Sequence, residues 1–309
     1  MMESRGKNPL AEARKLEPHI PQEYRDEMQG MVQTAGVSYE DLLVGNTIFD
    51  SMSLFGCSLF AVSQDTQTKQ ISRVMATNYH HSRGRSGQPN VDRSFQRYDA
   101  LQACPWSTST QTLQTALLFA NYYDTVQSIL FDPQTHDIHL ATAGQYAANT
   151  KYTHLKGSDL FGRSFMQRTG QKIVKLARNF DWPLPFLGPM TTVIVRPTSP
   201  GKKATAIVGW AGLTGAFSGM NEDGTALSIS IVPSDRQEGI PNQFLFRKIL
   251  EEASDIRTAD NIVDALKPAS SMNLCLAAAD GIEMLELDPK RKAQSAAFRT
   301  LQSEQRHPI

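Results

Sequence analysis

Short apolar runs separated by polar turns restrict this 309-residue chain to a fold rich in antiparallel strands. The clearest pair joins residues 273–279 to residues 282–287 across Asp280-Gly281, a dipeptide that favours the two-residue turn of a β-hairpin. Similar patterns predict two more hairpins and four further strands: 58–63 with 71–78, 128–131 with 138–143, and 172–177, 192–195, 204–208 and 226–232.

Helical periodicity occurs in groups between these strands. Residues 8–35 carry apolar side chains at helical spacing up to Gly36, and Ser38 lies three residues before Asp41, which predicts a capped second helix. Further helices are predicted at 95–101, 109–120, 243–253 and 259–266. Helices grouped between antiparallel hairpins indicate a layered α+β fold. We therefore expect residues 1–309 to form one domain, with residues 1–56 as a helical leader.

The charge balance and the cysteine pattern exclude several classes of function. Lys plus Arg and Asp plus Glu each number 31, so the formal net charge is +0 and no nucleic-acid partner is expected. Residues 1–15 hold charges of both signs and no apolar run, which argues against a secretory signal. No stretch has the roughly 18 to 20 apolar residues of a membrane helix, so we expect a cytoplasmic protein without a membrane partner. Three widely spaced cysteines and seven histidines without a ligand motif predict neither disulfides nor a metal site nor a cofactor.

Cys57 is the residue on which the functional interpretation depends. It follows Gly56 where the helical leader gives way to strand-like sequence, and cleavage of the Gly56/Cys57 bond would make it the first residue of a new chain. Its thiol would then be a nucleophile, and its α-amine, with an unperturbed pKa of about 7.7 to 8.0, would be the base. The alternative is an inert core cysteine, because free cysteines are among the most buried residues.

Other polar residues stand at the ends of predicted strands and also have structural alternatives. Arg178, Asn179 and Asp181 end one strand, either as functional groups or as a solvated salt link. Asn273 heads an apolar strand, either as an oxyanion donor or as a hydrogen-bonded cap. The residue types alone leave both alternatives open.

Six stretches carry a resemblance to a known family: AGVSYEDLL at 35–43, FGCSLFAV at 55–62, ARNFDWP at 177–183, VGWAGLTG at 208–215, GMNEDG at 219–224 and NLCLAAAD at 273–280. Jointly they resemble the acyl-coenzyme A:6-aminopenicillanic acid acyltransferase family, the C45 group of N-terminal nucleophile hydrolases. The resemblance implies a four-layer αββα sandwich and self-cleavage before Cys57. It also implies hydrolysis or transfer of an acyl group from a linear amide or a thioester.

The resemblance also implies roles for individual residues. Cys57 matches the nucleophile, with its freed amine as the base. Asp181 with Arg178 matches the pair that orients them, and Asn273 matches the oxyanion donor.

The family also has an arginine in the segment that matches residues 90–101. Both Arg93 and Arg97 fall in this segment, and the sequence does not decide between them. With Asn179, they are the candidates for substrate binding. Surface charge is the alternative for both arginines.

The order of the segments departs from the family. There, the strand that begins with the nucleophile is followed at once by the strand that ends in Arg-Asn-x-Asp-Trp, whereas about a hundred residues intervene here. Read as 1–70, then 172–309, then 71–171, the chain would follow the family order. We therefore predict a member with rearranged segments, which folds tolerate when the new joins fall in exposed loops.

The sequence thus predicts a self-processing cysteine amidase or acyltransferase that acts on a small-molecule amide or thioester. Cleavage would give a heterodimer of residues 1–56 and 57–309. Two alternatives are a non-catalytic binding or scaffold protein of the same fold, and an unprocessed Cys/His hydrolase that uses His80 or His81.

Overall fold

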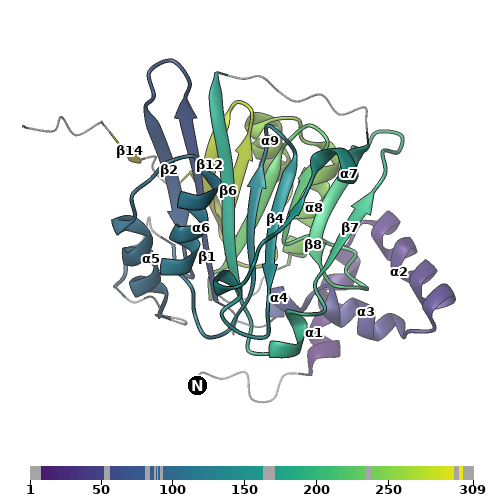
Figure 1. The fold of residues 1–309 in the computed structure, drawn as a ribbon. Helices are drawn as coiled ribbons and strands as arrows, with labels where there is room; N and C mark the ends of the chain where they lie inside the picture. Colours follow the sequence, from purple (N-terminus) through teal and green to yellow (C-terminus); the bar gives the residue numbers. More distant parts are fainter. Residues whose placement is uncertain are drawn as a thin grey trace, which may run out of the picture.

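The fold consists of two antiparallel β-sheets packed face to face between helices (Figure 1). The computed structural model describes residues 8–51, 56–80, 84–86, 88, 90, 93–162, 171–233, 238–295 and 299–301. Within these ranges each sheet has seven strands. The helix–sheet–sheet–helix order confirms the α+β class and the four-layer αββα sandwich. No helix in the described ranges is long and apolar enough to cross a membrane.

The first sheet contains the strand that carries Cys57, with neighbours that come from distant parts of the sequence. Its pairings are antiparallel throughout. In spatial order the strands are β14 (Arg299–Leu301), β2 (Ile71–Ala76), β1 (Gly56–Asp65), β6 (Lys172–Asp181), β3 (Thr125–Asp132), β4 (Asp137–Thr142) and β5 (Thr153–Leu155).

The second sheet is also antiparallel, and its strands follow one another in sequence order. The predicted hairpin is confirmed as the pair β11–β12, but its two-residue turn is Ala279-Asp280 and not Asp280-Gly281, because Gly281 already pairs with Ala278. In spatial order the strands are β13 (Arg291–Ser295), β12 (Gly281–Asp288), β11 (Met272–Ala278), β10 (Ala226–Ile231), β9 (Ser218–Asn221), β8 (Thr205–Gly209) and β7 (Thr192–Arg196).

Helices cover the outer face of each sheet. Two of them, α5 (Ser94–Ala103) and α6 (Thr110–Phe119), pack on the first sheet, and α8 (Asn242–Glu252) and α9 (Ile256–Ala265) pack on the second. The Asp255 side chain caps α9 by accepting a hydrogen bond from Thr258 N at 2.8 Å. Shorter elements are α7 (Gly157–Phe161), η1 (Glu17–His19), η4 (Ala147–Asn149) and η5 (Pro185–Leu187).

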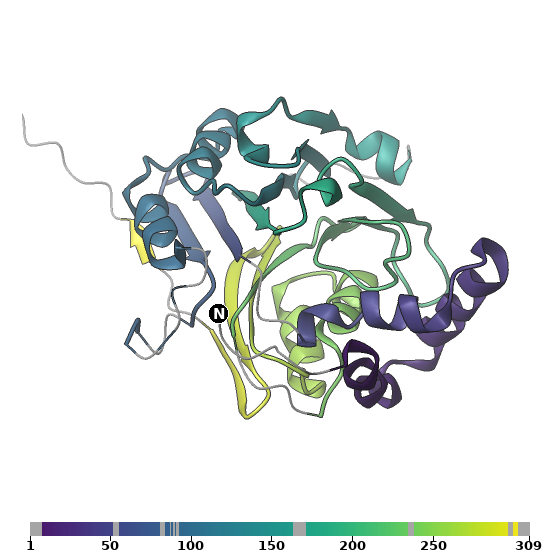
Figure 2. The same ribbon diagram turned by 90° about the horizontal axis from the view of Figure 1, so that it is seen from below.

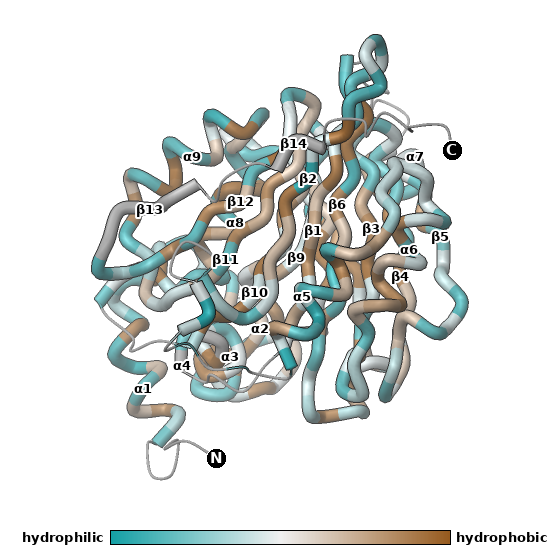
Figure 3. Tube along the Cα trace, turned by 90° about the vertical axis from the view of Figure 1, so that its left-hand side faces the viewer, coloured by the Kyte–Doolittle hydropathy of each residue, from teal (hydrophilic) through white to brown (hydrophobic). Residues whose placement is uncertain are grey.

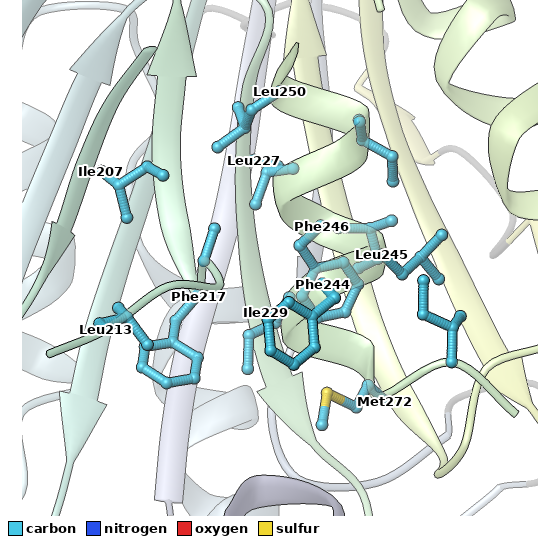
Figure 4. Close-up of a cluster of buried hydrophobic side chains, with 14 of the residues drawn as sticks. Ile207, Leu213, Phe217, Leu227, Ile229, Phe244, Leu245, Phe246, Leu250 and Met272 are labelled. Atoms are coloured by element: carbon cyan, nitrogen blue, oxygen red, sulfur yellow. The ribbon is translucent and has the colours of Figure 1, made fainter. Parts of the chain in front are cut away.

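Strand alternation divides the core into separate apolar layers. In β1, Leu59 and Ala61 pack against the second sheet, whereas Phe60 and Val62 pack against α5 and α6. A third cluster packs α8 against the second sheet, and Figure 4 shows its residues Phe244, Phe246 and Leu250 facing the strands. The hydropathy colouring in Figure 3 accordingly places the most apolar segments along the strands.

The predicted leader is an integral part of the fold. Its helices lie beside α8 (Figure 2), and Met28 and Leu43 are fully buried. The Tyr24 hydroxyl donates to Glu251 Oε2 in α8 at 2.8 Å. Asn46 Oδ1 accepts hydrogen bonds from the main-chain nitrogens of residues 214 and 215 at 2.7 and 3.0 Å. The leader helices are α1 (Pro9–Leu16), α2 (Gln22–Ala35), α3 (Tyr39–Gly45) and α4 (Ile48–Ser51).

The prediction of one continuous helix over 8–35 is wrong. The segment contains two helices separated by η1, and Ile20 has an extended backbone with ψ 126°. Pro21 explains the break, because a proline lacks the N–H that a helix interior needs and disfavours helical geometry in the preceding residue. The predicted cap at Ser38 is confirmed, since its Oγ accepts a hydrogen bond from Asp41 N at 3.0 Å.

Strand β1 has different partners on its two edges. It pairs with β2, which follows it in sequence, and with β6, which comes about a hundred residues later. Asp65 stands opposite Lys172 at one end of the β1–β6 pair, and Leu301 stands opposite Ile71 in the β14–β2 pair. Both joins of the rearranged family order would therefore connect antiparallel neighbours. The rearranged order itself stays a prediction.

A chain reordered as 1–70, 172–309 and 71–171 should fold to the same structure. Each new join would link antiparallel neighbours, β1 to β6 and β14 to β2, and short loops suffice for such connections. We expect an unchanged far-UV circular dichroism spectrum and cooperative thermal unfolding. A control chain with its new join placed inside β1, between Leu59 and Phe60, should not fold. A reordered chain that aggregates or unfolds without cooperativity would contradict the prediction.

Carboxyl groups between α9 and β12 should make stability depend on pH. Burial, and then the negative charge of Glu283, raise the pKa of Asp260 to about 7. The folded chain therefore holds this proton more tightly than the unfolded chain, and the free energy of unfolding falls as the pH rises from about 4 to about 7. Asp260→Asn should raise the melting temperature at about pH 8 and change it little at about pH 4. Calorimetry showing equal shifts at both pH values would refute this.

Candidate active site

Cys57 lies at the end of the first sheet, between β2 and β6. In the β1–β6 register it stands opposite Phe180, and Gly56 stands opposite Asp181. Strand alternation turns the Cys57 side chain toward the second sheet, into the same apolar cluster as Phe180 and Phe217. The side chain is 0% exposed, so the thiol is fully enclosed in the uncleaved chain.

Arg178 holds the thiol from the neighbouring strand. Its Nη2 donates to Cys57 Sγ at 3.1 Å, and its Nη1 donates to Ser218 Oγ in the second sheet at 2.7 Å. The guanidinium carbon also lies 4.3 Å from the centroid of the Phe180 ring. A buried positive charge therefore stands between the two sheets, beside the sulfur atom.

The environment of the thiol keeps it protonated. Burial raises the pKa of the Cys57 thiol, the charge of Arg178 opposes that effect, and the charge of Asp181 adds to it. Because the thiolate is the reactive form, attack on a carbonyl group requires a base that removes this proton. An α-amine on the same residue would meet that need.

Asp181 forms a buried ion pair on the opposite face of the first sheet. Arg97 Nη1 donates to Asp181 Oδ2 at 2.6 Å, and Thr125 Oγ1 donates to Asp181 Oδ1 at 2.5 Å. The side chains of Arg97 and Asp181 are 4% and 0% exposed. Arg97 Nη1 also donates to Ser58 Oγ at 2.7 Å, so one arginine of α5 ties β1 to β6.

Asn78 is a site residue that the sequence interpretation missed. Its Oδ1 accepts hydrogen bonds from Cys57 N at 2.9 Å and from Arg97 Nη2 at 2.8 Å, and its Nδ2 donates to Ile231 O at 2.8 Å. The predicted hairpin of 58–63 with 71–78 could have indicated that Asn78 lies beside Cys57. Extending the observed register, in which Leu59 stands opposite Ala76, by two residues places Asn78 opposite Cys57.

Asn273 lies in β11 and contacts the segment that carries Asn78. Its Nδ2 donates to Thr77 O at 2.8 Å and to Tyr79 O at 3.0 Å. Both amide hydrogens are therefore engaged by main-chain oxygens on either side of Asn78. The oxyanion role predicted for Asn273 would require one of these bonds to break, and in this conformation the side chain positions residues 77–79.

The structure separates the three substrate-binding candidates. Arg97 lies in the network around Cys57, whereas Arg93 is an exposed residue at the start of α5 with a φ of 57°. Asn179 is fully buried. Its Nδ2 donates to Leu117 O at 2.8 Å and its Oδ1 accepts from Ser128 Oγ at 2.7 Å. The amide of Asn179 therefore joins β6 to α6 and β3, which is a structural role.

The remaining candidates for nucleophile, base or ligand are placed as follows. Cys104 and Cys275 are free and buried, as Cys57 is. His80 is buried and its main-chain nitrogen donates to Gln88 Oε1 at 2.8 Å, while His81 lies outside the described residues. Within the described ranges, no three His, Cys, Asp or Glu side chains are grouped so that they could hold a metal ion.

The arrangement has the components of acyl transfer. A thiol lies beside a fixed positive charge that can stabilise a thiolate. The nitrogen of the same residue is held by Asn78, and the ion pair of Arg97 with Asp181 fixes Asn78 in turn. All of these groups converge on the Gly56/Cys57 peptide from the strands β1 and β6, the segment after β2 and the helix α5.

Comparison with known proteins supports an acyltransferase or amidase type of activity. No curated protein matches the chain. Residues 168–303 match the family model for acyl-coenzyme A:6-aminopenicillanic acid acyl-transferase. The matched region begins just before β6 and includes Arg178, Asp181 and Asn273. The second half of the chain is therefore similar to the acyl-coenzyme A:6-aminopenicillanic acid acyl-transferase family.

Proposed function

We propose that this protein is a self-processing cysteine amidase or acyltransferase. The observation that carries the proposal is the pair of contacts on Cys57, with its sulfur 3.1 Å from Arg178 Nη2 and its nitrogen 2.9 Å from Asn78 Oδ1. The match of residues 168–303 to the family model supports acyl transfer or amide hydrolysis as the general activity. An N-terminal nucleophile needs such an arrangement, because one residue supplies both the nucleophile and the base.

Self-cleavage would begin with transfer of the Gly56 acyl group from the Cys57 nitrogen to the Cys57 sulfur. The C–S bond forms, the C–N bond breaks, and the nitrogen takes up the proton of the thiol. Water then hydrolyses the thioester to a Gly56 carboxylate and a free thiol. Asn78 Oδ1 already accepts a hydrogen bond from this nitrogen, so the new amine would form in a position that is held in advance.

Turnover would repeat the same chemistry on a substrate. The amine takes the thiol proton, and the thiolate, stabilised by Arg178, attacks the carbonyl carbon of an amide or thioester. The tetrahedral oxyanion needs hydrogen-bond donors, for which Asn273 and Asn78 are the side-chain candidates. The proton passes to the leaving group, and water or an amine then releases the acyl group from the sulfur.

The leader would stay attached after cleavage. Its contacts with the rest of the chain include the bond from Tyr24 to Glu251 and the two main-chain bonds to Asn46. Asp50 also accepts a hydrogen bond from Ser270 Oγ at 2.7 Å. These buried contacts do not depend on the Gly56/Cys57 bond, so the product would be a heterodimer of residues 1–56 and 57–309.

A non-catalytic binding protein is the second candidate. The full burial of the Cys57 thiol and its raised pKa favour it, because an enclosed, protonated thiol is unreactive. The two proposals differ in what happens to the Gly56/Cys57 bond, which stays intact in a binding protein.

The intact mass of the purified protein should show two chains that meet at Gly56/Cys57. Cys57→Ala should give one uncleaved chain and no turnover, because it removes the sulfur that attacks. Cys275→Ala is the matched control, since this second fully buried cysteine lies in β11 and should leave cleavage intact. A wild-type protein that stays uncleaved under all conditions would count heavily against the proposal. An uncleaved chain whose Cys57 still reacts with an electrophilic probe would favour the Cys/His hydrolase.

Asn273→Ala should slow turnover by a few hundred-fold and leave KM nearly unchanged, since one oxyanion donor typically lowers the barrier by about 2.7 to 4 kcal/mol. Ser230→Ala is the control, because Ser230 stands opposite Asn273 in β10 and its hydroxyl has no hydrogen-bond partner among the described residues. Steady-state kinetics with both variants tests this. A lower melting temperature with unchanged kcat would show instead that Asn273 only positions residues 77–79.

A further inference from the structure

A cavity of about 340 Å³ lies at the end of the β-sandwich that is remote from Cys57. The ends of β1, β2 and β6 line it on one side, and the β11–β12 turn and the start of α9 line it on the other. This is the upper end of the sheets in Figure 1. Asp65 in the cavity wall lies eight residues from Cys57 on β1, which corresponds to roughly 26 Å along an extended strand. The cavity is therefore separate from the candidate active site.

The inner face of the first sheet changes from apolar to polar at this cavity. Ala61 packs toward the second sheet, so the two-residue period of the strand turns Ser63 and Asp65 the same way. The strand registers place Ser72 opposite Ser63 and Lys172 opposite Asp65, and all four of these residues line the cavity. Hydroxyl and charged groups therefore face the space between the two sheets, which apolar side chains fill further along β1.

Ser63 points to a ligand because its hydroxyl is buried without a partner. The residue is 6% exposed, and its hydroxyl forms no hydrogen bond with the residues that the structure describes. A buried hydroxyl of this kind destabilises the fold unless something in the cavity provides a hydrogen bond. Because Ser63 lies in the cavity wall, an occupant can donate a hydrogen bond to its Oγ.

The charges in the cavity wall favour a cation. Three carboxyl groups, from Asp65, Asp280 and Glu283, line the cavity together with the ammonium group of Lys172. Lys172 Nζ donates to the main-chain oxygen of Asp280 at 2.9 Å. Asp65 Oδ1 accepts hydrogen bonds from two main-chain nitrogens of the following turn at 2.9 and 2.7 Å, which lower the pKa of this carboxyl group. Formal negative charges outnumber the positive one, so the wall repels an anion.

Apolar side chains in the same wall indicate an organic cation rather than a metal ion. Ile256 and Ile282 also line the cavity. In the part of the chain that the structure describes, no three His, Cys, Asp or Glu side chains are grouped so that they could hold a metal ion. At about 340 Å³ the cavity is near the lower limit of the roughly 300 to 1,000 Å³ of small-molecule sites. The occupant that fits is therefore small, positively charged and partly apolar.

We propose that this cavity is a binding site for a linear aliphatic polyamine. The ammonium groups of the polyamine bind the carboxylates of Asp65 and Glu283 and donate to the Ser63 hydroxyl, and its methylene groups lie against Ile282. Such a molecule carries several ammonium groups on an apolar chain, which matches a wall of carboxyl groups and isoleucine side chains. The site acts apart from Cys57, so the inference does not depend on the proposed function.

The test titrates spermidine into the purified protein by isothermal calorimetry, at about 0.15 M ionic strength so that distant exposed charges are screened. The comparison ligands have chains of equal length: 1,8-octanediol is neutral and suberate is anionic. The site variant is Asp65→Asn with Glu283→Gln, in which the asparagine keeps an oxygen for the turn after β1. The matched control is Asp26→Asn with Asp159→Asn, which removes two exposed carboxyl groups outside the cavity.

We expect spermidine to bind the wild type at one site and at least about tenfold more tightly than either comparison ligand. The site variant should bind it at least about tenfold more weakly, because two charged partners are lost, whereas the control should match the wild type. Ser63→Val keeps every charge and removes the buried hydroxyl, so it should also weaken binding. Thermal unfolding shows whether each variant is folded, and if the site variant is not, the Ser63→Val comparison decides.

Absence of saturable spermidine binding, or equal weakening in the site and control variants, would overturn the inference. Equal binding of octanediol or suberate would also overturn it, because charge would then not select the ligand. Calcium chloride titrated alone should give no binding heat that the site variant loses, and a calcium site there would refute the polyamine assignment. The site variant should keep the wild-type behaviour at Gly56/Cys57, so either proposal can fail without the other.

Discussion

The antiparallel pairing of β1 with β6 is the constraint on which the candidate site depends. Because side chains alternate along a strand, this register turns Cys57 and Arg178 into the space between the sheets. The same register turns Ser58 and Asp181 toward α5, where Arg97 binds both. A shift of one residue would exchange the two faces and separate every one of these contacts. The ten residue pairs between the two strands hold that register.

Burial gives this network its chemical character. Arg97, Arg178 and Asp181 are charged groups with almost no exposure to water, and the loss of hydration is costly unless hydrogen bonds replace it. Each of them makes two or more such bonds across different elements, so the geometry around the Gly56/Cys57 peptide is set before any bond is cut. The same burial raises the pKa of the thiol, which makes its activity depend on a nearby base. A nucleophile of this kind would gain its base only when cleavage frees the Cys57 amine.

The leader is a structural part of the folded chain. The leader is anchored by buried contacts to α8 and to residues 214–215, so it contributes to the core whether or not it remains covalently attached. In the proposed function, the polar network around Cys57 performs the chemistry.

The sequence by itself determined the layered α+β class, because hairpin turns, strand patterns and helix caps are local signals. It also singled out Cys57, Arg178 and Asp181, whose neighbours match a family pattern. The sequence-based prediction of one helix over residues 8–35 was wrong. It followed the helical spacing of the apolar residues and did not take into account that Pro21 interrupts a helix. Only the tertiary structure brought β6 beside β1 across about a hundred intervening residues, because strand pairing in a sheet is a non-local choice.

The tertiary structure also decided between residues that the sequence could not separate. Arg97 and Arg93 lie in the same segment, and only the packing of α5 on the sheet brings Arg97 to Asp181. Asn78 was identified as a site residue only by its hydrogen bond to the Cys57 nitrogen. Asn273 holds the main chain on both sides of Asn78. A residue type and its spacing indicate what chemistry a side chain can perform. The distance to its partners, which depends on the whole fold, decides whether it is placed to do so.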